Sequence, residues 1–70
     1  MPLSKVKFNK TYIVNKIEVE QDDVRNFLFS LGCYPGEEIT IISKMASNYV
    51  VNIKDARYSI DKDLAKAIMV

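Results

Sequence analysis

The sequence contains no histidine, a single cysteine and two glycines in 70 residues. Histidine is the commonest neutral metal ligand and the usual general base near pH 7, so its absence disfavours metal sites and acid–base catalysis. One cysteine forms no internal disulfide, whereas small secreted domains usually depend on several. The cysteine count therefore favours a reducing compartment.

Long hydrophobic runs are also missing, the longest being the four residues Ala67–Val70. A membrane span needs about 20 apolar residues, and the core of a signal peptide needs about 7 to 15. We therefore expect a cytoplasmic protein. With 49% hydrophobic and 27% charged residues and no low-complexity tract, residues 1–70 are predicted to form one small globular domain.

An excess of charge of one sign is also missing, because ten basic and nine acidic residues leave a net charge of +1. Nucleic-acid binding depends on a concentrated basic surface that displaces counterions from phosphates. An RNA-binding domain is therefore the least favoured functional class.

The first ordered pattern is the alternation in Thr11–Glu20, which predicts a half-buried strand. Ile13, Ile17 and Val19 are expected on its inward face. The ten residues before it are expected to cross the surface of the domain to reach this strand.

A helix is predicted next, in "DDVRNFLFSLG", because Val24, Phe27, Leu28 and Leu31 recur at helical spacing. Asp22 is the expected N-cap.

The stretch "LGCYPG" holds both glycines. Gly32 is placed to end the helix in the left-handed conformation, which glycine adopts without a steric clash. Pro35 and Gly36 suit the second and third positions of a type II turn. The pattern predicts a helix exit followed at once by a reversal into a strand.

Three alternating segments then predict an antiparallel meander. Their expected inward residues are Ile39 and Ile41, then Tyr49, Val51 and Ile53, then Tyr58 and Ile60. The predicted connections are a loop at residues 46–48 and a tight turn at Asp55-Ala56.

Asp61 is the expected cap of one helical turn, with Leu64 facing inward, before a last strand at residues 67–70. The prediction is a mostly β fold of five short strands, with one short α-helix after the first strand and a helical turn before the last. Strands this short avoid open edges most economically by curling into a small barrel.

The residues from Arg25 to Ile39 read "R-x-x-L-x-x-L-G-x-x-P-G-x-x-I". This pattern resembles the FeoA family of small cytoplasmic accessory proteins of bacterial ferrous-iron uptake. The opening "MPLSKVK" and the closing "YSIDKDLAKAIMV" resemble the two ends of that family. The resemblance implies an SH3-like β-barrel that binds the cytoplasmic G-protein region of a membrane iron permease. The same barrel occurs as the C-terminal domain of metal-dependent repressors of the diphtheria-toxin-repressor type.

No metal, cofactor or catalytic site is predicted from the residues. The acidic residues between positions 18 and 23 are interpreted as a solvated face and a helix start. Cys33 is interpreted as buried filler, since it follows the negative end of a helix. The serines have no histidine to activate them, so an enzyme is not expected.

Partner contacts are assigned to aromatic, flexible apolar and basic side chains at the helix, turns and strand ends. These candidates are Arg25, Phe29, Tyr34, Met45 and Tyr49. Phe29 lies about 150° from the predicted apolar stripe at 100° per residue. It either packs under a neighbouring segment or is exposed.

Two functional hypotheses remain. The first is a non-enzymatic module that docks on the cytoplasmic part of a ferrous-iron permease and modulates it. The alternative is a free-standing regulatory barrel, related to the repressor domains, that associates with itself or binds a regulator.

Overall fold

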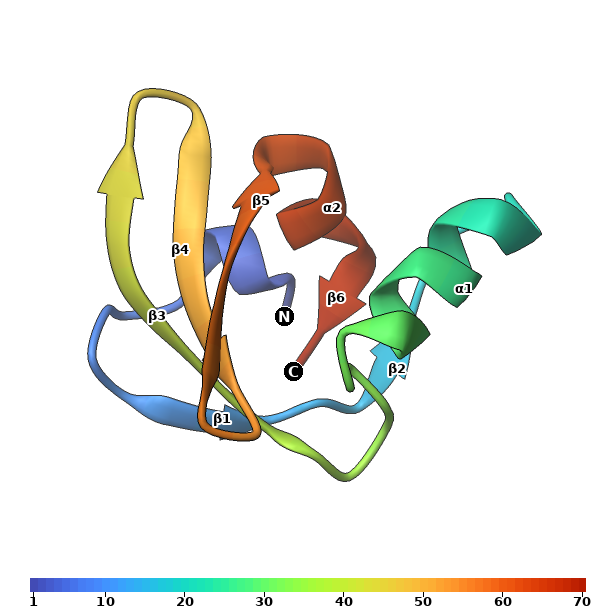
Figure 1. Ribbon diagram of the computed structural model, residues 1–70, viewed down its shortest axis with the longest axis horizontal. Helices are drawn as coiled ribbons and strands as arrows, with labels where there is room; N and C mark the ends of the chain where they lie inside the picture. The colour runs from blue at the N-terminus through green and yellow to red at the C-terminus, as the bar shows by residue number, and fades with distance from the viewer.

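The computed structural model describes all 70 residues as six short strands, two α-helices and one 3-10 turn (Figure 1). In chain order these are η1 Leu3–Lys5, β1 Thr11–Ile13, β2 Lys16–Ile17, α1 Asp22–Ser30, β3 Glu38–Met45, β4 Asn48–Ile53, β5 Ala56–Asp61, α2 Lys62–Ala67 and β6 Ile68–Met69. The fold is mostly β with a helix after the first strands and a helical turn before the last, as predicted.

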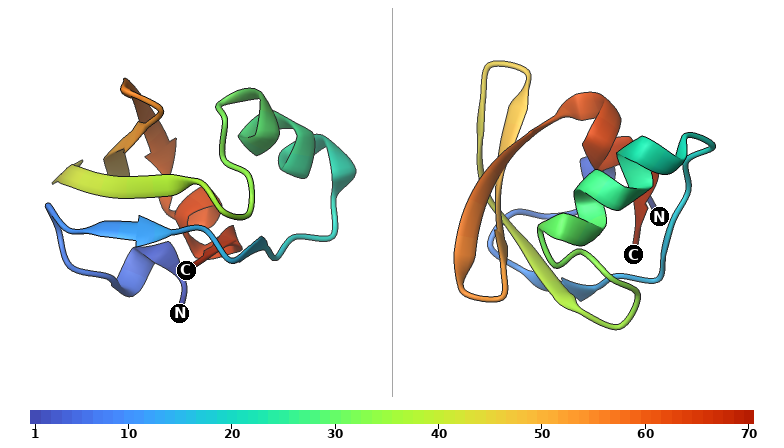
Figure 2. Two further views of the ribbon diagram at one scale, coloured as in Figure 1. Left: turned by 90° about the horizontal axis from the view of Figure 1, so that it is seen from below. Right: turned by 45° about the vertical axis from the view of Figure 1, so that its right-hand side comes forward.

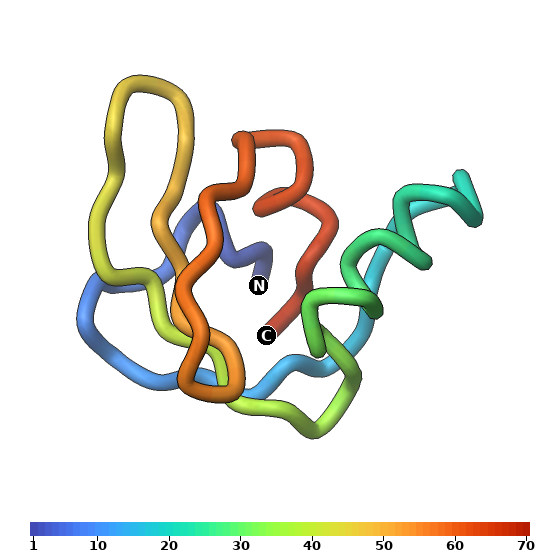
Figure 3. Tube along the Cα trace, viewed as in Figure 1, coloured from blue at the N-terminus to red at the C-terminus, as the bar shows by residue number.

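One antiparallel sheet has the order β1-β3-β4-β5, and a two-stranded sheet joins β2 to β6. The chain ends lie together (Figure 3), because an isolated bridge pairs Pro2 with Met69 and Met1 and Val70 exchange two hydrogen bonds of 3.0 and 2.8 Å. α1 lies to one side of the four-stranded sheet in both views of Figure 2.

The predicted meander is confirmed, because β3, β4 and β5 pair in sequence order. Its predicted inward residues lie in the core, with Tyr58 packed at the edge of the core. A β-bulge between Ile41 and Ser43 shifts the register of β3 against β4. The bulge gives β3 an extra residue, Ile42, and so adds local twist.

The first strand differs from the prediction in extent and in the face of its first half, whereas Ile17 is buried and Val19 packs against the core as predicted. It is divided into β1 and β2, and Ile13, expected to be buried, is 54% exposed. Tyr12 pairs with inward-facing Ile39, and cross-strand partners point to the same side of a sheet. Tyr12 therefore turns inward and Ile13 turns outward beside Glu38.

Residues 1–10, which were expected only to cross the surface, also contribute to the core. η1 turns Leu3 fully into the core, and Val6 is buried with it. The first residues are therefore a structural part of the barrel.

The start and the buried face of α1 also differ from the prediction. Gln21, not Asp22, is the N-cap residue, and it makes no side-chain capping bond. Phe27, expected in the apolar stripe, is 49% exposed, whereas Phe29 packs against the core with Leu28 and Leu31. The helix packs on the core through Leu28 and Phe29. The predicted apolar stripe is therefore partly exposed, at Phe27.

The helix end and the following turn form as predicted. Gly32 has φ +89°, and Cys33 N–H and Gly32 N–H donate to the carbonyls of Leu28 and Phe29 at 3.1 and 2.9 Å. These two bonds define a Schellman motif. Glu37 N–H then donates to the Tyr34 carbonyl at 3.0 Å, and Gly36 has φ +94°, as a type II turn requires.

Both hairpins of the meander have two-residue turns. The first turn is one residue shorter than the predicted loop, and the second begins one residue earlier than predicted. Ala46-Ser47 joins β3 to β4, and Lys54-Asp55 joins β4 to β5. Lys54 and Asp55 both have positive φ, which identifies a type I′ turn. Ala46 alone has positive φ in the other turn, at 55°.

The C-terminal elements confirm the predicted cap. Leu64 N–H donates to the Asp61 carboxylate at 2.8 Å. Within α2, Ala65 and Ala67 are buried and Leu64 packs against the core from its edge. The predicted last strand is reduced to Ile68–Met69.

Cys33 is fully buried in the core, as predicted. Burial raises the pKa of its thiol to about 11, because the core disfavours the charged thiolate. Neither of the two α-helices has the length and apolar character that crossing a membrane requires.

Candidate interaction surface

The predicted contact residues do not all lie on one surface. Arg25 and Phe29 lie on α1, Tyr34 lies in the turn that follows, and Met45 ends β3 at the opposite end of that strand. Tyr49 is only 5% exposed and belongs to the core. Burial removes Tyr49 from any surface in the folded protein.

Arg25 mainly serves to attach α1 to the preceding segment. Its guanidinium donates to the Val19 carbonyl and, at 3.0 Å, to the Asp22 carboxylate. The second bond links residues one helical turn apart, where side chains are neighbours. Two hydrogen bonds of the Arg25 guanidinium are thus used within the chain.

Phe29 and Tyr34 are brought together by the Schellman motif and the turn. Their rings stack with centroids 5.0 Å apart and planes inclined by 21°. Phe29 packs on the core, and Tyr34 is 43% exposed. The partly buried ring of Phe29 therefore supports the exposed ring of Tyr34.

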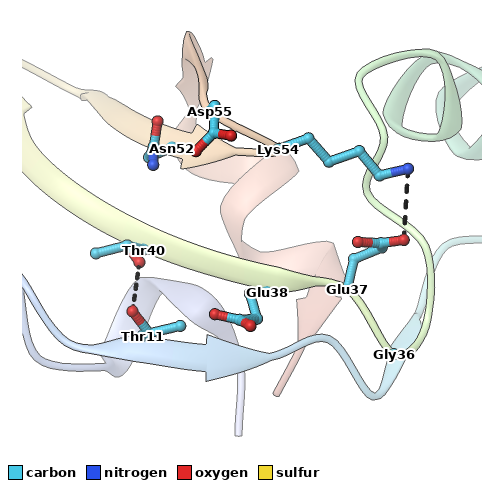
Figure 4. A pocket seen from close by; sticks show the side chains of 8 residues that line it. All are labelled: Thr11, Gly36, Glu37, Glu38, Thr40, Asn52, Lys54 and Asp55. Carbon is cyan, nitrogen blue, oxygen red and sulfur yellow. Dashed lines mark hydrogen bonds and ion pairs between the residues drawn. The ribbon is translucent and has the colours of Figure 1, made fainter.

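Lys54 completes this cluster from the β4–β5 turn. Its Nζ lies 5.6 Å from the centroid of the Tyr34 ring. The same Nζ lies 3.4 Å from Glu37 Oε1, as Figure 4 shows. We call Phe29, Tyr34, Glu37 and Lys54 the turn patch. It joins an aromatic face to one positive and one negative group.

A polar groove of about 340 Å³ adjoins the turn patch and shares two of its residues, Glu37 and Lys54. Its lining residues come from β1, β3, β4 and two turns: Thr11, Gly36, Glu37, Glu38, Thr40, Asn52, Lys54 and Asp55. Thr11 and Thr40 share a 3.0 Å hydrogen bond on its floor (Figure 4).

Charge in the groove is only partly compensated. Lys54 pairs with Glu37, while Glu38 and Asp55 make no ion pair. The sequence prediction missed the groove, since its residues are far apart in the chain and meet only through strand pairing. Their outward alternation on β3 and β4 is the one sequence signal for them.

An exposed aromatic ring that stacks on a partly buried one, next to charged and hydrogen-bonding groups, is typical of protein–protein contacts. The turn patch and the groove can therefore bind by stacking, hydrogen bonding and charge. The side chains form no group of three His, Cys, Asp or Glu residues that could hold a metal ion.

Comparison with solved structures defines the class of the fold. The FeoA protein of Stenotrophomonas maltophilia, crystallised with zinc and described as a prokaryotic SH3 domain protein, matches with a TM-score of 0.88 at 23% identity. The match covers 100% of this chain and 88% of that one. The fold is therefore an SH3-like barrel.

An iron uptake regulatory protein, FeoA, matches with a TM-score of 0.88 at 28% identity, over 100% of this chain and 93% of that one. The IdeR protein of T. acidophilum matches with the same TM-score at 30% identity, over 100% of this chain and 32% of that longer chain. No curated protein matches at the level of sequence.

The model of the FeoA domain matches residues 1–70. The chain belongs to the FeoA family, as the resemblance in its sequence implied.

Proposed function

We propose that this protein is a non-enzymatic accessory protein of ferrous-iron uptake that acts in the cytoplasm. It binds the G-protein region of a membrane iron permease and modulates it. The match of the FeoA domain model over residues 1–70 carries this proposal. The names of the similar FeoA proteins, which refer to iron uptake and ferrous-iron transport, support it.

The turn patch is the docking surface in this proposal. Tyr34 is its central group, because its ring is exposed on one side and held by Phe29 and Lys54. Rigid aromatic side chains of this kind often contribute most of the affinity of an interface. Arg25 near the start of α1 and Met45 at the far end of β3 lie outside the turn patch, so they contribute less to binding than Tyr34 does.

A binding measurement tests the proposal. The purified protein is titrated into the soluble G-protein region of the ferrous-iron permease of the same organism, and heat of binding and GTP turnover are recorded. We expect Tyr34→Ala to weaken binding about tenfold or more.

Phe8→Ala is the matched control, because Phe8 is an aromatic residue of nearly equal exposure, 45% against 43%, away from the turn patch. It is expected to bind like the wild type. Wild-type affinity no better than that of an unrelated small barrel, with unchanged GTP turnover, would reject the permease as partner.

The similarity to IdeR favours one second candidate. In that longer protein the matching segment makes up 32% of the chain, which is the arrangement expected of a regulatory barrel attached to other domains. A free-standing regulatory role predicts binding to a regulator protein encoded near this gene, with no effect on GTP turnover by the permease.

A further inference from the structure

β5 is an edge strand. All six of its residues pair with β4, and no strand lies on its other side (Figure 1). An edge strand presents unpaired backbone groups that can bind another strand.

The register identifies the free groups. Ile53 and Ala56 close a two-residue turn, so Ala56, Tyr58 and Ile60 direct their N–H and C=O groups toward β4. Arg57 and Ser59 direct theirs away from β4. Neither residue takes part in the backbone hydrogen bonds outside the regular elements. The edge therefore offers two donors and two acceptors in an exposed segment.

Opposite charges stand near the two ends of this edge. Arg57 and Asp61 are both exposed, lie on the same face of β5 with Ser59 between them, and make no ion pair. Asp61 uses one carboxylate oxygen for the Leu64 cap and leaves the other free. A strand with a positive group at one end and a negative group at the other is complementary to an antiparallel copy of itself.

We propose that the free edge of β5 is a self-association surface that takes a second copy of this chain. The two β5 strands pair antiparallel about a two-fold axis at Ser59. Arg57 then faces the partner's Asp61, and Tyr58 faces the partner's Ile60.

Charge selects this register over its nearest alternative. An axis at Tyr58 would place Arg57 opposite the partner's Ser59 and each Asp61 opposite the partner's Asp55, which carries the same charge. The axis at Ser59 forms two symmetrical ion pairs, and opposite charges directly across two strands stabilise their pairing.

The association is weak, because one short strand from each subunit forms the contact. Interfaces below about 1,200 Å² belong to transient complexes. We therefore expect a dimer that forms with a dissociation constant between about 10 μM and 1 mM.

Sedimentation equilibrium of the whole chain tests this surface. Over about 10 μM to 1 mM, the range of the expected dissociation constant, the average mass should rise from 8.0 kDa toward twice that value. A mass that stays at 8.0 kDa at every concentration would overturn the proposal.

Two variants locate the contact. Arg57→Glu replaces both attractive pairs by repulsive ones and should weaken the dimer about tenfold or more. Lys7→Glu is its control, since Lys7 is exposed, makes no ion pair and undergoes the same change of charge. Ser59→Pro removes an edge donor that β4 does not use, and edge strands tolerate proline at such positions.

Each result decides the question. Loss of association in Arg57→Glu, with the Lys7→Glu variant unchanged, supports the proposed register. Association of Arg57→Glu equal to that of the wild type overturns it, even if Ser59→Pro fails to fold. If Ser59→Pro folds and still dimerises like the wild type, the edge is not the contact.

Discussion

The ammonium group of Lys54 lies 5.6 Å from the ring centroid of Tyr34, and the stem of the same side chain passes over Gly32. Lys54 thereby connects the β4–β5 turn to the exit of α1. Two features favour glycine at position 32. Its φ is positive, and the absence of a Cβ leaves space for the Lys54 side chain.

Gly32→Ala should lower the free energy of unfolding by about 1 to 2 kcal/mol, because alanine disfavours φ +89° and its Cβ would lie 3.1 Å from Lys54 Cδ. Chemical denaturation measures the loss. Gly36→Ala is the control, since Gly36 has a similar φ of +94° but a Cβ added there would meet no atom within 4 Å. An equal or larger loss in Gly36→Ala would show that the Lys54 contact adds nothing.

Ala46→Gly should raise the free energy of unfolding by about 0.5 to 1 kcal/mol, because glycine adopts the positive φ of 55° without the steric cost that alanine bears. Thermal denaturation measures the change. Ala56→Gly tests the opposite case at the start of β5, where φ is not positive, and should destabilise the protein. A destabilised Ala46→Gly variant would contradict the strain assigned to this turn.

Cys33 should make stability depend on pH in the alkaline range. Its folded pKa, about 11, lies above the ordinary thiol value of 9.0, so the unfolded state loses the thiol proton first as pH rises. The contribution is complete below pH 9.0 and is lost as pH rises to about 11, by at most about 2 to 3 kcal/mol.

The measurement is the difference in unfolding free energy between the wild type and Cys33→Ala at a series of pH values, which cancels the titration of other groups. The stability of the wild type should fall relative to the variant above pH 9.0. A difference independent of pH would show that the thiol is solvated in the folded state.

Asp61→Ala should cost about 1 kcal/mol of unfolding free energy, because it removes the acceptor of the 2.8 Å bond from Leu64 N–H. Asp63→Ala is the matched change in the same helix. It removes a carboxylate from the first turn but no capping bond, so its cost should be about 0.5 kcal/mol or less. Equal losses would show that charge, not the cap, stabilises α2.

Phe29→Ala should destabilise the protein by about 2 kcal/mol or more, since its ring packs against the core and supports Tyr34. Phe27→Ala, a change of the same size two residues away at a 49% exposed position, should stay within about 0.5 kcal/mol of the wild type. A larger loss of stability in Phe27→Ala than in Phe29→Ala would show that α1 packs through the face that helical periodicity predicts.

Sequence periodicity located the helix but not its orientation. Val24, Phe27, Leu28 and Leu31 form the more regular apolar stripe, yet the helix packs through Leu28, Phe29 and Leu31. The side of a helix that meets the core depends on where the chain before and after it is attached. Here Arg25 holds one end to Val19, and the Schellman motif directs the other.

The same limit applies to β1 and to the candidate surface. Alternation in Thr11–Glu20 holds within each half but changes phase between β1 and β2, and pairing with β3 at Tyr12 and Ile39 decided which residues of β1 face inward. Tyr49 is the opposite case. Its place near a strand end predicted an exposed contact residue, but the barrel buries it. The Glu37–Lys54 pair and the groove depend on strands that only tertiary pairing aligns.

The sequence by itself determined the features that depend on neighbouring residues. These are the helix exit at Gly32, the type II turn at Pro35-Gly36, the Asp61 cap and the alternating meander. Each follows from local φ preferences, a nearby hydrogen bond or a two-residue period. The tertiary structure decided the inward face of α1, the division of the first strand and the assembly of the turn patch, because these depend on contacts between segments whose relative position no local preference sets.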